Sequence, residues 1–474
     1  NVMRKATKLY ALLGVLLVVC IAAFAVSRYE EKKEQIKNSG EVILEIPTDS
    51  VTALSWTNES GKFSFTKDET WVYDDDNAFP VDEEKINDLL EQFTSFAAAF
   101  SIDDVEDYAQ YGLDEPICTI HITAGEESYT VELGDFSKMD EQRYVSIGDG
   151  KVYLVSHDPL DEFGAVLRDL IRDDTIPEFD TVKQIAFSGE ESYTISYDEG
   201  GTSICADDVY FTDGTPLDTD TVNEWLTALR SLDLTNYVSY SATGEELQTF
   251  GLDNPALTVA LDYSSSSDED GNETDSGTFV LHLSQNPEEL AAYEEAIANE
   301  EDVLLDVTCY ARVGDSQIVY QITQSEFDAL TDVSYDALRH QKVFTADFDT
   351  VTSIDVTLEG ENYTFICTPP EDADDTDTEG TWTYQGVEFD IFDFSYALRA
   401  LAATNFTVET PTGQEEISLT LHLDNEDFST FTLTLYRYDG ESCIACVDGE
   451  PIAFVSRDKA VDLIEAVHAV TLGA

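Results

Sequence analysis

The sequence predicts an α+β protein of three tandem repeats, each a mainly antiparallel β-sheet with two packed helices, after an N-terminal transmembrane helix. Three observations lead to this prediction. Short motifs that begin with Asp-[Ser/Thr]-Val recur at residues 49–54, 180–185 and 349–354. Each motif is followed by runs of alternating apolar and polar residues, and then by an apolar stripe at helical spacing. Near the N-terminus, an uncharged run at 9–26 has about the length of a membrane span.

The N-terminal segment carries the membrane prediction. Residues 1–8 are a short basic tail, residues 9–26 a transmembrane anchor or a signal peptide, and residues 27–41 a linker. The apolar run is long for a signal-peptide core, which favours an uncleaved anchor. Because lysine and arginine flank the run on both sides, their count does not set the orientation. The short basic tail and the large acidic remainder favour a single-pass protein of the cell membrane with an extracytoplasmic body.

Each repeat is predicted to begin with three strands and a helix. The repeats cover residues 42–178, 179–347 and 348–474. Alternation with β-branched and aromatic residues indicates the strands. Apolar residues at i, i+3, i+4 and i+7 indicate a helix that packs on a sheet. The three stripes are Ile86, Leu89, Leu90 and Phe93; Val222, Trp225, Leu226 and Leu229; and Phe394, Ala397, Leu398 and Leu401.

A Gly-Leu-Asp-x-Pro loop follows this helix in the first two repeats and opens the next strand. The glycine suits a positive φ, the leucine can enter the core, and the proline suits a strand start. These roles describe a structural joint. The alternative is a partner-docking loop, because loops on a rigid scaffold often carry function. The residues concerned are Tyr111, Gly112, Leu113, Asp114 and Pro116, and Phe250, Gly251, Leu252, Asp253 and Pro255.

Further strands and a last helix close each repeat, and two insertions lengthen the second. Residues 264–276 are predicted to form a polar, acidic hairpin tip, and residues 286–305 a helix rich in glutamate and alanine. A further acidic tip in the third repeat places Asp375, Asp377 and Glu379 before a glycine, as in the first half of a calcium loop. The closing glutamate of such a loop is missing, so these three residues are only weak calcium candidates, and a solvated loop is the alternative.

Composition and motifs exclude several functions. With 24 basic and 98 acidic residues the net charge is -74, which repels nucleic acid. No phosphate-binding loop, zinc-protease motif or nucleophile elbow is present, so we expect no cofactor and no catalytic residue. Cys443 and Cys446 have C-x-x-C spacing within an alternating strand, where small core residues are expected. His121 and His422 are expected at matching strand positions, without a catalytic role.

This order of elements behind a membrane anchor, with the [Tyr/Phe]-Gly-Leu-Asp-x-Pro loop at 111–116 and 250–255, resembles the bacterial family called domain of unknown function 4340. The resemblance covers nearly everything after residue 41. It implies a single-pass or lipid-anchored envelope protein, and the family's genes often lie beside those of gliding-motility-type ABC transporters. It implies no catalytic residue. The third repeat departs from the family pattern because it lacks the loop.

We therefore expect a non-enzymatic extracytoplasmic binding or scaffold protein, an accessory of an envelope ABC transport system. Its partners would be the membrane, through the N-terminal helix, and ABC transporter subunits or other envelope proteins. One alternative is a cell-surface protein that binds cell-wall glycan or divalent cations. A second alternative is a hydrolase with an unrecognised carboxylate pair, because 98 acidic residues create many accidental pairs.

Overall fold

The computed structural model describes residues 40–199, 208–266, 273–299, 306–369, 380–426 and 428–472. The predicted anchor at 9–26 and the calcium candidates Asp375, Asp377 and Glu379 lie outside these ranges. Within them, no helix combines the length and the apolar character that a bilayer span requires. The chain divides into two compact units, with the boundary between Asp173 and Asp174.

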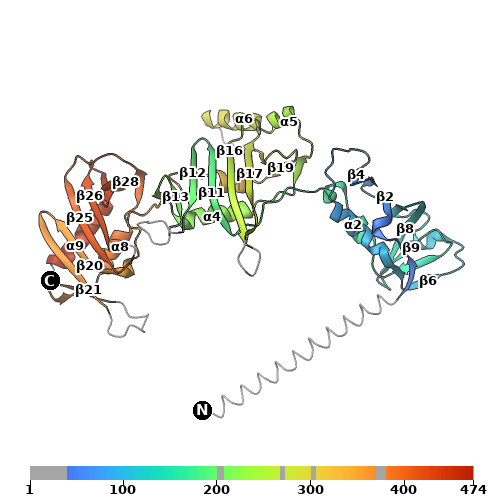
Figure 1. Ribbon diagram of the computed structural model, residues 1–474, viewed down its shortest axis with the longest axis horizontal. Coiled ribbons are helices and arrows are strands. Elements are labelled where there is room, and N and C mark those ends of the chain that lie inside the picture. Colours follow the sequence, from blue (N-terminus) through green and yellow to red (C-terminus); the bar gives the residue numbers. More distant parts are fainter. Residues whose placement is uncertain are drawn as a thin grey trace, which may run out of the picture. The chain divides into compact units, whose positions relative to one another are not determined.

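The first unit contains a large sheet and a small one (Figure 1). The strands of the large sheet are β2 (Val51–Asn58), β3 (Gly61–Lys67), β4 (Trp71–Tyr73), β6 (Phe100–Ile102), β7 (Cys118–Ala124), β8 (Glu127–Ser137), β9 (Gln142–Ser146) and β10 (Val152–Val155). Their order across the sheet is β4-β3-β2-β7-β8-β9-β10-β6. Strands β1 (Glu41–Leu44) and β5 (Phe96–Ala98) form the small sheet. The helices are α2 (Glu83–Glu91) and the one-turn α3 (Leu160–Phe163).

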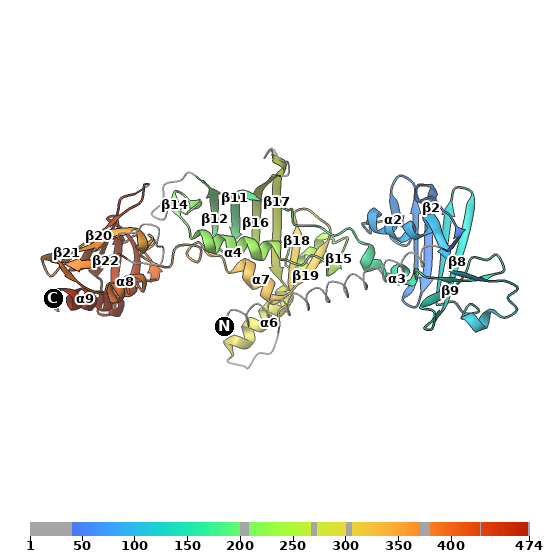
Figure 2. The same cartoon turned by 90° about the horizontal axis from the view of Figure 1, so that it is seen from below.

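The second unit contains two large sheets. The strands of the first are β11 (Thr181–Gly189), β12 (Ser192–Tyr197), β13 (Tyr210–Thr212), β14 (Thr215–Pro216), β15 (Tyr237–Ser239), β16 (Leu257–Ser266), β17 (Glu273–Gln285), β18 (Cys309–Val313) and β19 (Val319–Ile322). Its helices are α4 (Thr219–Arg230), α5 (Gly244–Thr249), α6 (Pro287–Ala298) and α7 (Gln324–Thr331). Figure 2 shows α4 and α7 beside these strands, and the Trp225 indole N–H donates to the Leu330 carbonyl at 3.1 Å.

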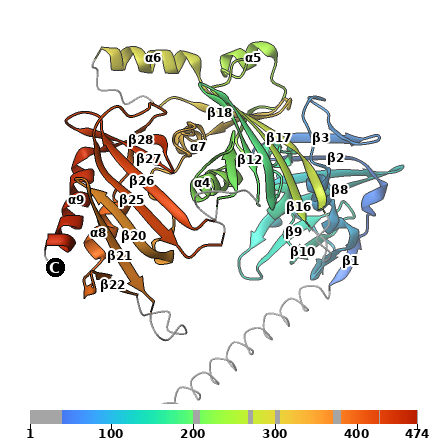
Figure 3. The same ribbon diagram turned by 60° about the vertical axis from the view of Figure 1, so that its left-hand side comes forward.

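The other large sheet of this unit consists of β20 (Val351–Leu358), β21 (Glu361–Thr368), β22 (Thr381–Tyr384), β23 (Val387–Glu388), β24 (Ala403–Phe406), β25 (Glu415–Leu423), β26 (Thr430–Arg437), β27 (Ser442–Val447) and β28 (Glu450–Ser456). Helices α8 (Phe392–Arg399) and α9 (Arg457–Leu472) pack together beside it (Figure 3).

The three large sheets share one strand order, apart from an extra edge strand, β14 or β23, in the two sheets of the second unit. The orders in the second unit are β14-β13-β12-β11-β16-β17-β18-β19-β15 and β23-β22-β21-β20-β25-β26-β27-β28-β24. In each sheet the first strand (β2, β11 or β20) lies in the interior, between the second strand and a later strand, β7, β16 or β25, that comes after the first helix and a short edge strand. The paired strands are antiparallel, so the prediction of an α+β chain with mainly antiparallel sheets is confirmed.

The three predicted helical stripes are buried against the sheets. Ile86 and Leu90 of α2, Leu226 of α4, and Leu398 of α8 are each at most 1% exposed. Aspartates begin two of these helices: the Asp82 carboxylate accepts from the Glu84 and Lys85 amides, and Asp218 caps α4 in the same way. In α2 and α4 the side-chain cap and the apolar stripe therefore indicate the same helix, and the stripe alone predicted α8.

Short edge strands were missed by the sequence analysis. β6, β15 and β24 follow the first helix that packs on their sheet and pair with its last long strand, at the far edge of the sheet. In the first unit, Ile102 lies opposite Val152. Strands of three or four residues are too short to show a period, and their partners come much later in the chain.

The predicted insertions form regular structure where the structure describes them. Residues 264–266 extend β16 and residues 273–276 begin β17, as expected for a long hairpin. Helix α6 lies within 286–305 and begins at Asn286, whose side chain caps it. None of its residues is buried, so the insertion adds an exposed helix.

A connecting segment at 333–347 ties the two sheets of the second unit together. The Asp218 amide donates to the Leu338 carbonyl at 3.0 Å, and the Ala403 amide donates to the Gln341 carbonyl at 2.8 Å. One short segment therefore bonds to the start of α4 and to β24, which belong to different sheets of the same compact unit.

The expected match between His121 and His422 is wrong. Leu54 and Ile354 hold the same place in β2 and β20, and they pair with Ile122 and Leu421. His121 precedes Ile122, whereas His422 follows Leu421, so the two histidines differ by two positions. A two-residue slip leaves the alternating pattern unchanged, and the sequence alone could not detect it.

Candidate functional site

The first Gly-Leu-Asp-x-Pro loop ends a 3-10 turn, η3 (Tyr108–Tyr111), and leads into β7. Gly112 has a φ of 66° and its N–H donates to the Ala109 carbonyl at 3.2 Å. The Leu113 N–H donates to the Tyr108 carbonyl at 3.1 Å, and the Leu113 side chain is only 6% exposed. This pattern is a helical C-cap with a left-handed glycine.

The second loop repeats this geometry after α5. Gly251 has a φ of 73°, and its N–H donates to the Gln248 carbonyl at 3.0 Å. The Leu252 N–H donates to the Leu247 carbonyl at 2.8 Å, and Leu252 is 5% exposed. The expectation that glycine takes positive φ and leucine enters the core is confirmed at both loops.

The aromatic residue that precedes each glycine packs on a tyrosine of the sheet. The ring centroids of Tyr111 and Tyr144 lie 4.9 Å apart, and those of Phe250 and Tyr310 lie 4.8 Å apart. In the second loop, the Ser284 hydroxyl also donates to the Phe250 carbonyl at 2.7 Å. These contacts hold the first loop against β9 and the second against β17 and β18 of its sheet.

The polar positions of the loops face outward. Asp114 and Asp253 are exposed, and Pro116 and Pro255 are half-buried. Within the described part of the chain, no hydrogen bond reaches either aspartate carboxylate. Architecture therefore accounts for the glycines and leucines, and a docking role for the loops stays a prediction.

Metal and thiol chemistry receive no support from the described side chains. Over these ranges, no group of three or more histidine, cysteine, aspartate or glutamate residues is placed to hold a metal ion. Cys443 and Cys446 are free and buried in β27, and burial raises the pKa of the Cys443 thiol to about 11. A thiol with this pKa is protonated at neutral pH, so it is a poor nucleophile.

Helix α8 carries an aromatic stripe on its outward face. Its inward residues, such as Phe394 and Leu398, are buried against the sheet. Phe392 and Tyr396, in contrast, are 64% and 66% exposed, and Arg399 continues the same face one turn later. The rings of Phe392 and Tyr396 are stacked, with centroids 6.1 Å apart and an interplanar angle of 19°.

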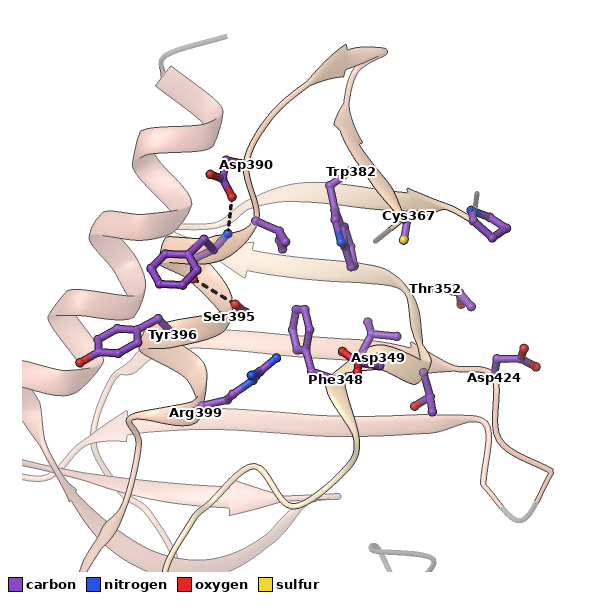
Figure 4. Close-up of a pocket in the computed structure, with 16 residues that line it drawn as sticks. Phe348, Asp349, Thr352, Cys367, Trp382, Asp390, Ser395, Tyr396, Arg399 and Asp424 are labelled. Carbon is purple, nitrogen blue, oxygen red and sulfur yellow. Dashed lines mark hydrogen bonds between the residues drawn. The ribbon is translucent and has the colours of Figure 1, made fainter. Parts of the chain in front are cut away.

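A cavity of about 890 Å³ adjoins this stripe, and we call it the α8 hollow (Figure 4). Its lining comes from α8 and from the ends of β20, β21, β22 and β25. Phe348 and Trp382, which are 8% and 7% exposed, lie between the stripe and the residues at the other end, Thr352 and Asp424. The hollow is therefore lined by buried and exposed aromatic rings together.

Polar groups of both signs surround these rings. The Arg399 guanidinium carbon lies 5.1 Å from the centroid of the Phe348 ring, and no described carboxylate forms an ion pair with Arg399. The Asp390 carboxylate accepts from the Phe392 amide at 2.8 Å, and Asp349 lines the hollow near Phe348. The arrangement can bind a ligand that has an apolar face and a polar edge.

The corresponding helices of the other two sheets have no such stripe. We align the three helices on their buried residues. Phe392, Tyr396 and Arg399 of α8 then correspond to Glu84, Asp88 and Glu91 of α2. In α4 the corresponding residues are Asp220, Glu224 and Thr227. Sequence reasoning missed this site because it compared only the inward stripes. The signal was present at the outward positions, where acidic residues give way to Phe, Tyr and Arg.

Comparison with protein families identifies the chain. The family model "Domain of unknown function (DUF4340)" matches residues 71–208 and 212–419, which is most of the chain. The chain belongs to this family. No curated protein and no solved structure matches it.

The two DUF4340 segments are offset from the sheets. Each begins at the third strand of a sheet, at Trp71 in β4 and at Thr212 in β13. Both Gly-Leu-Asp-x-Pro loops and the α8 stripe lie within the DUF4340 segments. The hollow is therefore built largely from residues that belong to the family's own domain.

Proposed function

We propose that this chain is a non-enzymatic binding protein of the cell envelope, and that the α8 hollow holds its ligand. The observation that carries the proposal is the outward face of α8, where Phe392 and Tyr396 expose about two thirds of their surface. Exposed aromatic residues beside an arginine mark binding surfaces, because their apolar area is removed from water only in a complex. The volume of the hollow also falls within the range of ligand sites, about 300–1,000 Å³.

The contrast within the chain strengthens this proposal. A solvated acidic helix face is the norm in a protein of net charge -74, and α2 and α4 follow it. On the outward face of α8, Phe392 and Tyr396 are exposed, and the neighbouring Arg399 is exposed as well although it lies over the buried Phe348 ring. A role in binding gives them a physical reason.

A photo-crosslinking experiment in intact cells tests the proposal. Tyr396 is replaced by p-benzoylphenylalanine in the full chain, and the matched control replaces Glu224 on the outward face of α4. We expect light to trap an envelope component at position 396 and not at position 224. Identical products at the two positions would contradict a site on α8.

We further propose that the protein is an accessory of an envelope ABC transport system, with an extracytoplasmic body held by an anchor at residues 9–26. This step rests on the family resemblance and on the apolar run. Purification of the chain from crosslinked membranes should recover transporter subunits, and their consistent absence would count against the accessory role. Protease added to intact cells should digest the body, whereas a body that resists until lysis would contradict the location.

The architecture supports a third part of the proposal, that residues 42–178, 179–347 and 348–474 are three copies of one unit. The support comes from the common strand order of the large sheets. In this proposal the three copies have the same architecture, and only the third copy carries the binding residues of the α8 hollow.

A further inference from the structure

We infer that the ligand of the α8 hollow is a neutral carbohydrate, a short stretch of glycan whose sugar rings lie on the aromatic stripe. This inference rests on the proposed function, because it names the ligand class of the same site. It depends on three properties of the hollow: its flat aromatic surfaces, its hydrogen-bonding groups and its charge.

The first property is the aromatic platform. The rings of Phe392 and Tyr396 are within 19° of parallel and largely exposed, and Trp382 also lines the hollow. One face of a pyranose ring presents only C–H groups, which carry slight positive charge. Such a face packs well on the electron-rich face of an aromatic ring.

The second property is the mixture of donors and acceptors at the edge of the platform. The carboxylates of Asp349 and Asp390 can only accept hydrogen bonds, and the guanidinium of Arg399 can only donate them. A sugar hydroxyl does both, so one ring can satisfy both kinds of group. A purely apolar ligand would leave these groups without partners on its arrival.

The third property is charge. A polyanion would meet Asp349, Asp390 and Asp424 in a chain of net charge -74. The single cationic side chain among the described lining residues, Arg399, lies over the ring of Phe348. A neutral ligand avoids the repulsion that a polyanion meets. The lining extends from Tyr396 past Trp382 to Asp424, so more than one sugar ring can be accommodated (Figure 4).

Calorimetric titration of the full chain tests the inference. The neutral probes are the trimers of N-acetylglucosamine, β-1,4-linked glucose and α-1,4-linked glucose. The charged probe is the trimer of galacturonic acid. We expect saturable binding of at least one neutral trimer, and binding of the anionic trimer that is at least about tenfold weaker.

Variants locate the binding. Phe392→Ala and Tyr396→Ala should each weaken the neutral trimer about tenfold or more, because each removes part of the platform. The matched control is Tyr438→Ala, which removes an aromatic residue of similar exposure, 50%, from the turn between β26 and β27, outside the hollow. Unchanged melting temperatures for all three variants would show that the loss is local.

Two results would overturn the inference. One is the failure of all three neutral trimers to bind, and the other is an equal effect of Tyr438→Ala and Tyr396→Ala. If the crosslinker at position 396 then traps a protein, the glycan is wrong and the binding function stands. If the crosslinker traps nothing at that position, the proposed function fails as well.

Discussion

Replacing Gly112 by alanine tests whether the Gly-Leu-Asp-x-Pro loop is a structural joint. Alanine at a φ of 66° is in the left-handed region, which costs about 1–2 kcal/mol. In addition, its Cβ would lie 2.9 Å from the amide nitrogen of Asp135 in β8. Backbone cannot move aside as a flexible side chain can, and overpacking of this kind costs about 1–3 kcal/mol. Gly112→Ala should therefore lower the unfolding free energy of the first unit by about 2–5 kcal/mol.

The matched control is Gly125→Ala in the turn between β7 and β8. Gly125 has a nearly equal φ of 61°, but no atom lies within 4 Å of the position of its added Cβ. Only the backbone strain applies, so a loss of about 1–2 kcal/mol is expected. Hydrogen exchange read by mass spectrometry across a urea series reports the first unit separately from the second. Equal losses of unfolding free energy for the two variants would refute the argument from the close contact with Asp135. If Gly112→Ala left the unfolding free energy unchanged, the structural reason for Gly112 would be wrong and a docking role of the loop would be favoured.

Two further predictions concern charged side chains of the two units. Burial by itself lowers the pKa of His340, but the hydrogen bond and attraction of Asp208, aided by Asp218, outweigh it and hold the pKa above its ordinary value of 6.5. The stabilisation of the folded state by charged His340 is full below pH 6.5 and is lost as the pH rises through the raised pKa. His340→Gln should therefore lower the urea midpoint of the second unit at about pH 5.5 and change it little at about pH 9. Equal losses at both pH values would contradict this prediction. Arg143, 7% exposed, donates to the Asp158 carboxylate at 2.5 Å, so Arg143→Met should destabilise the first unit by about 3–5 kcal/mol in urea unfolding, because it leaves the largely buried Asp158 charge without its cation and with only the Leu160 amide as a partner among the described residues. Adding Asp158→Asn should restore part of that loss, and no restoration would argue that packing of Arg143 matters instead.

The sequence predicted the first helix of each repeat and the two loops well because both depend on local rules, whereas the last helix expected in the first repeat is only the one-turn α3. The stripe at Val222, Trp225, Leu226 and Leu229 lies on one side of a helix wherever that helix is placed, and all four residues are buried. Gly112 and Gly251 have positive φ because the C-cap requires it. These features need no knowledge of distant segments.

The edge strands and the histidine register depended on distant segments and were missed or misplaced. Ile102 becomes part of a strand only because Val152 lies beside it. The positions of His121 and His422 depend on which residue of β2 or β20 each strand faces, and alternation is blind to a slip of two residues.

By itself, then, the sequence determined the class of the fold, the repeated helices, the capped loops and an acidic surface, since each follows from periodicity, capping chemistry or composition. Only the tertiary structure decided the strand order and the site. Phe392, Tyr396 and Arg399 are three outward residues on one helix until packing brings Phe348 and Trp382 to the same hollow from the strand ends. The physical reason is that a binding site is a relation between segments far apart in the chain, and that relation exists only after the sheets have paired and buried their helices.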